Sequence, residues 1–160
     1  MYKALGVLHT GERVYDRSPS HIHAGVRPLI REIVADINSR RRSTIVYSVE
    51  YDRPIGVSSV VATRPGDRIV FAKRQGRRGT SRFVKNRRSE STNVVTIILR
   101  QTPSGDYQVM TAHLGYPAPR EPWDESHPPR QSVDFWKRHA FVWGVEPTVR
   151  GSESFRPPGR

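Results

Sequence analysis

Hydrophobic residues between positions 24 and 39 recur at steps of three and four. They are Val26, Leu29, Ile30, Ile33, Val34 and Ile37. This spacing places them on one face of an amphipathic helix. Because Pro28 is tolerated only in a first helical turn, the helix is expected to begin between Ala24 and Arg27 and to end near Ser39. His21 and His23 are therefore expected at or just before its N-terminus.

After residue 43 the hydrophobic period changes to two, which is typical of β-strands. Five segments follow this pattern: Thr44–Tyr51, Gly56–Thr63, Arg68–Arg74, Thr92–Gln101 and Tyr107–Gly115. The sequences RPGD at 64–67 and PSGD at 103–106 are turn signals that join successive strands. The pattern therefore predicts a run of antiparallel strands after the first helix.

The last third of the chain predicts one more helix. Residues 117–129 read as a proline-rich loop, and Ser132–Trp143 is expected to form a short helix that carries aromatic residues. The predicted fold class is α+β, with an N-terminal amphipathic helix and a short C-terminal helix packed on a central antiparallel sheet of about 4–6 strands. The length fits a single domain over residues 1–150, followed by a disordered basic tail over 151–160.

Strand alternation separates core from open positions. In the strand from Tyr107, one face carries Met110, Ala112 and Leu114 and is expected to be core. The other face carries Tyr107, Val109, Thr111 and His113. Thr111 and His113 are then neighbours on an open face. By the same alternation, either Lys73 or Arg74 reaches a concave face of the sheet.

Charge limits the expected partners. The chain has a net charge of +12, and its segment from Arg68 to Arg88 contains Lys and Arg but no Asp or Glu. Such a field attracts polyanions, so nucleic acid is the first candidate partner, an acidic protein the second and an anionic membrane the third. With no Cys, thiolate metal sites and a Cys nucleophile are excluded.

Nothing in the sequence indicates membrane insertion. There is no run of about 18 apolar residues, and the N-terminal segment is too polar for a signal peptide. The site of action is expected to be the cytoplasm, whether the protein stays there or is exported by a route that needs no N-terminal signal.

The candidate chemistry is RNA cleavage without a metal. The 2′-OH attacks the adjacent phosphorus, which requires a base, an acid and hydrogen-bond donors to the developing phosphorane. Histidine suits the first two roles near neutral pH, and Lys, Arg and hydroxyl groups suit the third. The candidate catalytic residues are His21, His23, Lys73, Arg74, Ser81, Arg82, Thr111 and His113. Since no acidic pair or His-x-x-Glu spacing stands out, no metal or cofactor is expected.

Several motifs between about Ser20 and Val142 resemble one family. They are a helix opened by His, the strand motifs K-R and T-S-R-F, the hairpin T-x-x-V-x-I-x-L…Y-x-V-x-T-A-H-x-G, and then E-P-W-D and F-W-x-x-H-A. This set is similar to the barnase, colicin D and RelE-like (BECR) fold of metal-independent ribonuclease toxins, above all the toxin domains of bacterial competition systems. The resemblance implies an active site in the concave face of the sheet and cleavage of tRNA, mRNA or rRNA. It also implies a cognate immunity or antitoxin protein, which is expected to be acidic.

The resemblance also implies roles for individual residues. His23, or His21, would be the general base or acid, and His113 the other candidate acid. The phosphate would be held by Arg82 and by Lys73 or Arg74. Ser81 and Thr111 would donate hydrogen bonds to it. Flanking phosphates would be bound by the remaining cations of the basic segment, namely Arg77, Arg78, Lys85, Arg87 and Arg88.

Two other functions are compatible with the same sequence. A non-catalytic RNA-binding or nucleic-acid-binding module could use the basic segment 68–88, with Phe83 and Tyr107 available for stacking. An interaction protein could use the same basic face to dock an acidic partner. Nuclease activity in EDTA separates the first function from both alternatives, and a steep salt dependence of RNA binding separates the two alternatives.

Overall fold

The computed structural model describes residues 2–17, 22–124 and 128–158. Within these residues the fold is α+β, as predicted, with two α-helices and three sheets of five, four and two strands. The chain divides into two compact units. Unit 1 consists of Met1–Val57 and Ser91–Pro117, and unit 2 of Ser58–Glu90 and Ala118–Arg160. The sequence pattern predicted one domain over residues 1–150, whereas the chain passes between the two units three times.

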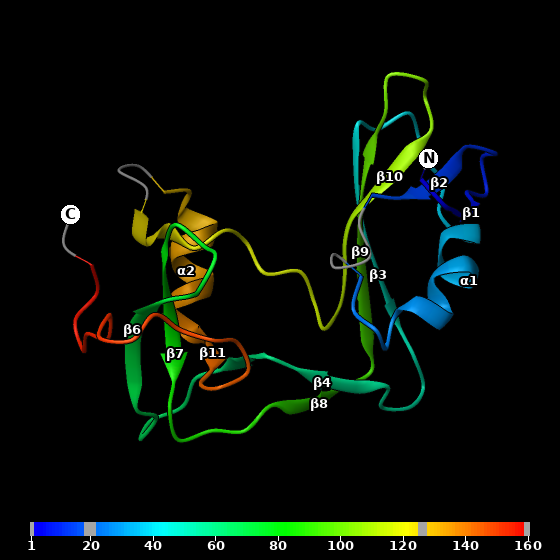
Figure 1. The fold of residues 1–160 in the computed structure, drawn as a ribbon. Helices are drawn as coiled ribbons and strands as arrows, with labels where there is room; N and C mark the ends of the chain where they lie inside the picture. The colour runs from blue at the N-terminus through cyan, green and yellow to red at the C-terminus, as the bar shows by residue number, and fades with distance from the viewer. Residues whose placement is uncertain (1, 18–21, 125–127, 159–160) are drawn as a thin grey trace. The chain divides into compact units, whose positions relative to one another are not determined.

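Unit 1 is built on the five-stranded sheet, whose order is β1-β2-β10-β9-β3. Its strands are β1 (Ala4–Val7), β2 (Arg13–Asp16), β3 (Thr44–Glu50), β9 (Val94–Gln101) and β10 (Tyr107–Leu114). β10 pairs antiparallel with β9, as the hairpin signal predicted, and parallel with β2. The helix α1 (Ile30–Ala35) packs beside β1 in unit 1 (Figure 1).

The first helix is shorter than the sequence predicts. The chain makes a turn after His23, then the 3-10 helix η2 (Arg27–Leu29) and then the six residues of α1. Pro28 lies in η2, so it is in the first helical turn as expected. The hydrophobic period is confirmed, because most of the predicted face is buried in the core of unit 1. The buried members are Val26, Ile30, Ile33, Val34 and Ile37.

A β-bulge in β10 changes the predicted core face. The pairing of β10 with β9 shifts register between Val109 and Thr111, which leaves Met110 as the extra residue. An inserted residue exchanges the two faces of a strand for every position after it. The buried residues are therefore Tyr107, Val109 and Ala112. The expectation that Met110 is core is wrong, as is the expectation that Tyr107 and Val109 face outward, whereas Ala112 is core as predicted.

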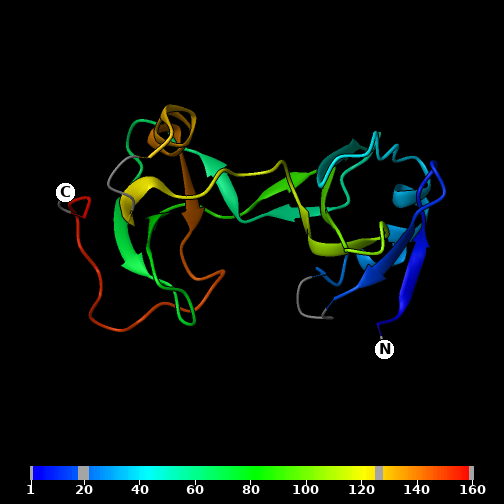
Figure 2. The ribbon, with the colours of Figure 1, turned by 90° about the horizontal axis from the view of Figure 1, so that it is seen from above.

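Unit 2 contains the four-stranded sheet, with the order β5-β11-β7-β6. Its strands are β5 (Val60–Ala62), β6 (Ile69–Lys73), β7 (Thr80–Val84) and β11 (His139–Val142). The helix α2 (Arg130–Arg138) leads directly into β11 (Figure 1 and Figure 2). The two-stranded sheet of β4 (Gly56–Ser58) and β8 (Glu90–Thr92) contains two of the points where the chain passes between the units.

The second helix ends earlier than the sequence predicts. α2 ends at Arg138, and residues 139–142 form the strand β11 instead. The guanidinium of Arg82 donates to the carbonyl oxygens of Trp136 (3.0 Å) and His139 (2.7 Å), so it satisfies acceptors at the C-terminal end of α2. The next residues pair with β5 and β7, and Ala140 and Val142 are buried.

The C-terminal segment, expected to be disordered from residue 151, is hydrogen-bonded to β6 at Ser152 and Ser154. Ser154 exchanges two backbone hydrogen bonds with Phe71, of 2.7 and 2.8 Å. The Lys73 amide donates to Ser152 Oγ at 3.0 Å. Among the described helices, none has the length and hydropathy needed to span a bilayer.

Candidate functional site

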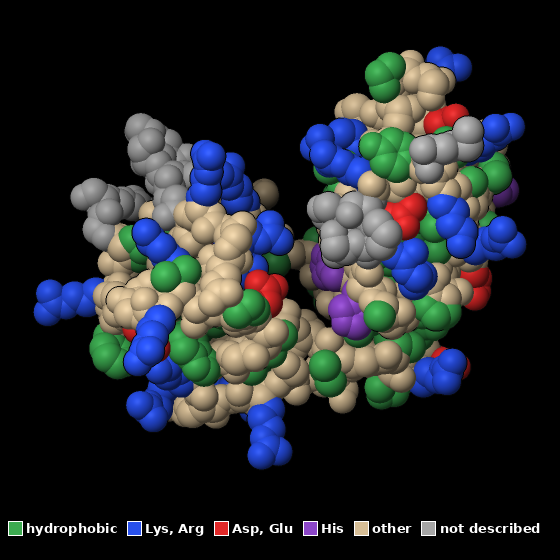
Figure 3. All heavy atoms as spheres, in the orientation of Figure 1, with side chains coloured by type: hydrophobic (Ala, Val, Ile, Leu, Met, Phe, Trp, Pro, Cys, Tyr) green, Lys and Arg blue, Asp and Glu red, His purple; other side chains and the backbone are tan. Residues whose placement is uncertain are grey.

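Two histidines from distant parts of the sequence lie side by side in unit 1. Ile22 forms a parallel bridge with Ala112, and the His23 amide donates to the Ala112 carbonyl oxygen at 2.8 Å. Ile22 and Ala112 are buried. Because neighbouring residues of an extended chain alternate faces, His23 and His113 share the opposite, outer face. Figure 3 shows histidine side chains gathered on one face of unit 1.

The same face carries further hydroxyl groups. Thr111 lies two residues before His113 on β10, after the bulge, and is half-buried. Across the sheet, His113 pairs with Thr96 and Thr96 pairs with Ser48. The Thr96 hydroxyl donates to the Gly115 carbonyl at 2.7 Å and so accepts the 2.9 Å hydrogen bond from Ser48. Thr111 is therefore the hydroxyl beside His113 that is available to a ligand.

The environments of the two histidines differ. Burial lowers the pKa of His113, and the positive charge of His23 lowers it further. His113 is therefore held neutral at neutral pH and can accept a proton. His23 is exposed, and its Nδ1 accepts a hydrogen bond from the Gly25 amide at 3.0 Å. The neutral ring of His23 consequently carries its proton on Nε2 and presents a donor.

The electrostatic coupling of this pair is directly testable. In the variant His23→Gln, the pKa of His113 is expected to rise because the second cause of its depression is removed. It should stay below its ordinary value because burial is unchanged. NMR titration of the His113 ring measures both effects. His9→Gln is the control, since His9 is an exposed histidine of the same unit. An unchanged His113 pKa in His23→Gln would contradict the proximity of the two rings.

Unit 2 contains a second group of predicted site residues. Arg74 Nε donates to Ser81 Oγ at 2.9 Å, and Ser81 Oγ donates to Glu121 Oε2, also at 2.9 Å. Arg74 also forms ion pairs with Glu121 (3.3 Å) and Glu146 (2.9 Å). Lys73, the alternative to Arg74, is exposed. Arg74, Ser81 and Glu121 line a pocket of about 300 Å³, whose other charged lining residues are Arg77, Arg78 and Arg120. We call it the arginine pocket.

Two cations of the basic segment are engaged within unit 2. Lys85 Nζ lies 2.6 Å from Glu153. Arg87 pairs with Asp67 at 3.1 Å and also with Glu90. Asp67 is almost fully buried, with 7% of its side chain exposed, so Arg87 balances a charge that water cannot reach. Lys85 and Arg87 are therefore already paired with acidic residues of unit 2.

The candidate residues thus form two groups, one in each unit. His23, Thr111 and His113 belong to unit 1, and Arg74, Ser81, Arg77 and Arg78 belong to unit 2. The guanidinium of Arg82 is hydrogen-bonded to carbonyl oxygens at the end of α2. His21 lies outside the described residues. Among the described residues, no group of three or more His, Asp or Glu could hold a metal ion.

Sequence reasoning gave no role to two residues of the arginine pocket. Arg120 and Glu121 line it together with Arg74 and Ser81. The signal was the E-P-W-D motif, which begins at Glu121 and contributed to the family resemblance without being assigned a function. A glutamate beside a proline in a loop gives no indication of burial, so its partners could be identified only in the folded chain.

No protein family, curated protein or solved structure was found to match the chain. The family resemblance of the motifs therefore stays an expectation. The features that indicate a function are the described side chains and the charge of the whole chain.

Proposed function

We propose that the protein is a metal-independent endoribonuclease. The observation that carries this proposal is the pairing of His23 and His113 on the outer face of unit 1, with a donor on one ring and a proton acceptor on the other. A base and a donor on one open face are what internal attack by a ribose 2′-OH requires. The strongly positive chain supplies the attraction for RNA.

In the proposed reaction, His113 takes the proton of the 2′-OH as the 2′-oxygen bonds to phosphorus. The P–O5′ bond breaks, and the leaving oxygen takes up the Nε2 proton of His23 in its imidazolium form, which leaves the neutral ring. Thr111 donates a hydrogen bond to a non-bridging oxygen, where negative charge develops. The products are a 2′,3′-cyclic phosphate and a 5′-hydroxyl end.

Substrate binding is proposed to involve unit 2 as well. Arg77, Arg78 and Arg88 are exposed, and no ion pair or side-chain hydrogen bond engages them among the described residues. Such cations bind phosphates and release counterions, which makes affinity fall steeply with salt. The proposed partners are RNA (tRNA, mRNA or rRNA) and an acidic immunity or antitoxin protein, because charge complementarity would speed capture of so basic a chain.

A second candidate function is non-catalytic RNA binding. The arginine pocket of unit 2 favours it, because a pocket with several arginines can hold a phosphate with no base or acid present. In this alternative the two histidines of unit 1 are incidental. Binding of RNA without cleavage would support this alternative.

The experiment that tests the proposal is incubation of total RNA with the purified protein in EDTA. We expect cleavage, with fragments that end in 2′,3′-cyclic phosphate and begin with a 5′-hydroxyl, because the internal nucleophile needs no metal-bound water. Enzymatic end-labelling and sequencing of the fragments identify the ends. Fragments with a plain 3′-hydroxyl, or activity that disappears in EDTA, would contradict the mechanism.

A further inference from the structure

The arginine pocket of unit 2 has a fixed floor. Arg74 has 15% of its side chain exposed and is held by Ser81, Glu121 and Glu146. Its guanidinium carbon also lies 4.5 Å from the centre of the Phe141 ring. A cation held in this way loses little conformational freedom when an anion binds. The floor is therefore preorganised before any ligand arrives.

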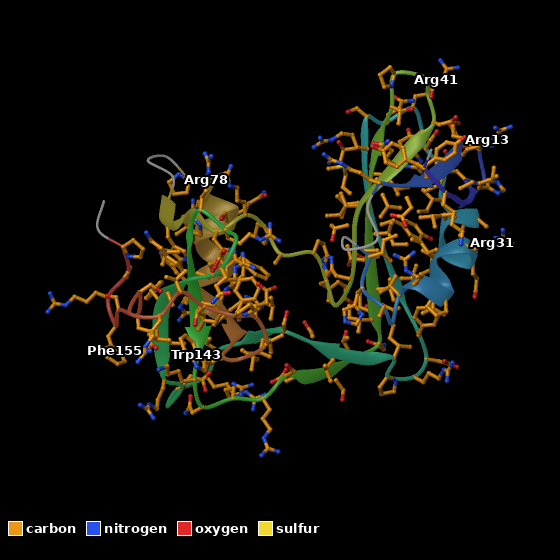
Figure 4. All side chains as sticks on the ribbon, viewed as in Figure 1. Arg13, Arg31, Arg41, Arg78, Trp143 and Phe155 are labelled. Carbon is orange, nitrogen blue, oxygen red and sulfur yellow. The ribbon has the colours of Figure 1, made fainter. Side chains whose placement is uncertain are left out.

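The rim of the pocket, in contrast, carries two arginines that form no ion pair among the described residues. Arg77 and Arg78 lie in the connection between β6 and β7, where Gly76 has a φ of +70°. Figure 4 labels Arg78 in this connection. Both arginines are exposed, and among the described residues neither guanidinium has an ion pair or hydrogen bond. Elsewhere on unit 2, Lys85 and Arg87 have acidic partners. The positive charge at this rim is therefore available to an anion from outside.

The charge and volume of the pocket indicate which anion fits. Four arginines and one glutamate line a pocket of about 300 Å³, so its formal charge is strongly positive. A phosphate at the end of a strand carries about 1.5 to 2 negative charges and three free oxygens, and it can enter a pocket end-on. An internal phosphodiester carries one charge and has a nucleotide on each side. A terminal phosphate is therefore the better match to a pocket lined by several arginines.

We propose that this pocket is a receptor for the terminal phosphate group of a nucleic-acid strand. The inference rests on the proposed function only in taking nucleic acid as the bearer of the phosphate, and it does not require cleavage. Arg74 forms the floor, Arg77 and Arg78 close over the phosphate, and Arg120 contributes to the positive wall. The site would direct the protein to strands that carry such an end.

The test uses a short DNA oligonucleotide in three forms: with a 5′-phosphate, with a 3′-phosphate and with neither. DNA lacks the 2′-OH, so binding is measured without any cleavage, and the result is independent of the ribonuclease proposal. We expect one phosphorylated form, or both, to bind about tenfold or more tightly than the unmodified strand, as charge-assisted hydrogen bonds allow. Inorganic phosphate should compete for this preference.

The variant Arg77→Ala/Arg78→Ala is expected to lose the preference, with its fold checked by circular dichroism. Arg88→Ala is the matched control, because it removes an exposed arginine of the same unit that does not line the pocket. It should weaken all three oligonucleotides alike and leave the preference intact. Equal binding of the three forms, or a preference that survives in the double variant, would overturn the proposal.

Discussion

Turnover of RNA is expected to fall at least about 10²-fold in His113→Ala, and similarly in His23→Ala, because general acid–base groups typically contribute about 10²- to 10⁴-fold. Each substitution removes one partner of the proposed acid–base pair. RNA affinity should change little, since the attraction comes mainly from the Arg and Lys side chains. The cleavage rate at saturating RNA, with affinity measured separately, tests both statements.

The control for these variants is His9→Ala. His9 is an exposed histidine of unit 1 and is not one of the groups that shift the pKa of His113. Its loss should leave turnover unchanged. If His113→Ala remains folded and cleaves at a rate close to that of the unaltered protein, the face shared by the two histidines is not the active site.

Replacing Arg74 with Ala is expected to lower the free energy of unfolding by about 3 kcal/mol. The substitution removes a mostly buried cation that contacts Ser81, Glu121 and Glu146 at once. Ser81 is only 1% exposed, so water cannot readily take the place of its lost partner. Urea denaturation measures the change.

The control for this prediction is Arg64→Ala, which breaks an ion pair with Glu90 whose side chains are 69% and 45% exposed. Because water screens such a pair, the loss should be below about 1 kcal/mol. A double variant, Arg74→Met with Glu121→Gln, should recover part of the stability lost in Arg74→Ala, because it leaves no buried charge at Glu121. Equal losses for Arg74→Ala and Arg64→Ala would contradict the structural role of Arg74.

The fold could be predicted where the hydrophobic period was long and uninterrupted. The face from Val26 to Ile37 and the hairpin of β9 and β10 both follow from local spacing. The bulge at Met110 could not be predicted, because neither glycine nor proline marks it and the residues around it alternate as in a regular strand. The short strands β1 and β2 were also missed, since four residues give too little alternation to identify a strand.

The candidate site was predicted only in part, for a different reason. The helix start and strand parity made His23, Thr111 and His113 candidates, but the bridge between Ile22 and Ala112 that brings His23 beside His113 is seen only in the folded chain. The basic segment was considered in isolation, however, and the acids that neutralise Arg87 lie immediately outside it, at Asp67 and Glu90. Lys85 is paired with Glu153, far along the chain. The charge of a sequence segment does not show which of its cations form ion pairs within the folded protein.

The three passages of the chain between the units affect how the protein is made. Unit 1 needs β9 and β10, which follow β5, β6 and β7 of unit 2 in the sequence. On the ribosome, β3 therefore emerges well before its partner β9, and the first strands of unit 2 are complete while unit 1 is still missing its central pair. A fragment that stops at Val57 would expose the unpaired edge of β3, and unpaired edges promote aggregation. Neither unit can be obtained by simple truncation, and each would have to be produced as two segments joined by a new linker.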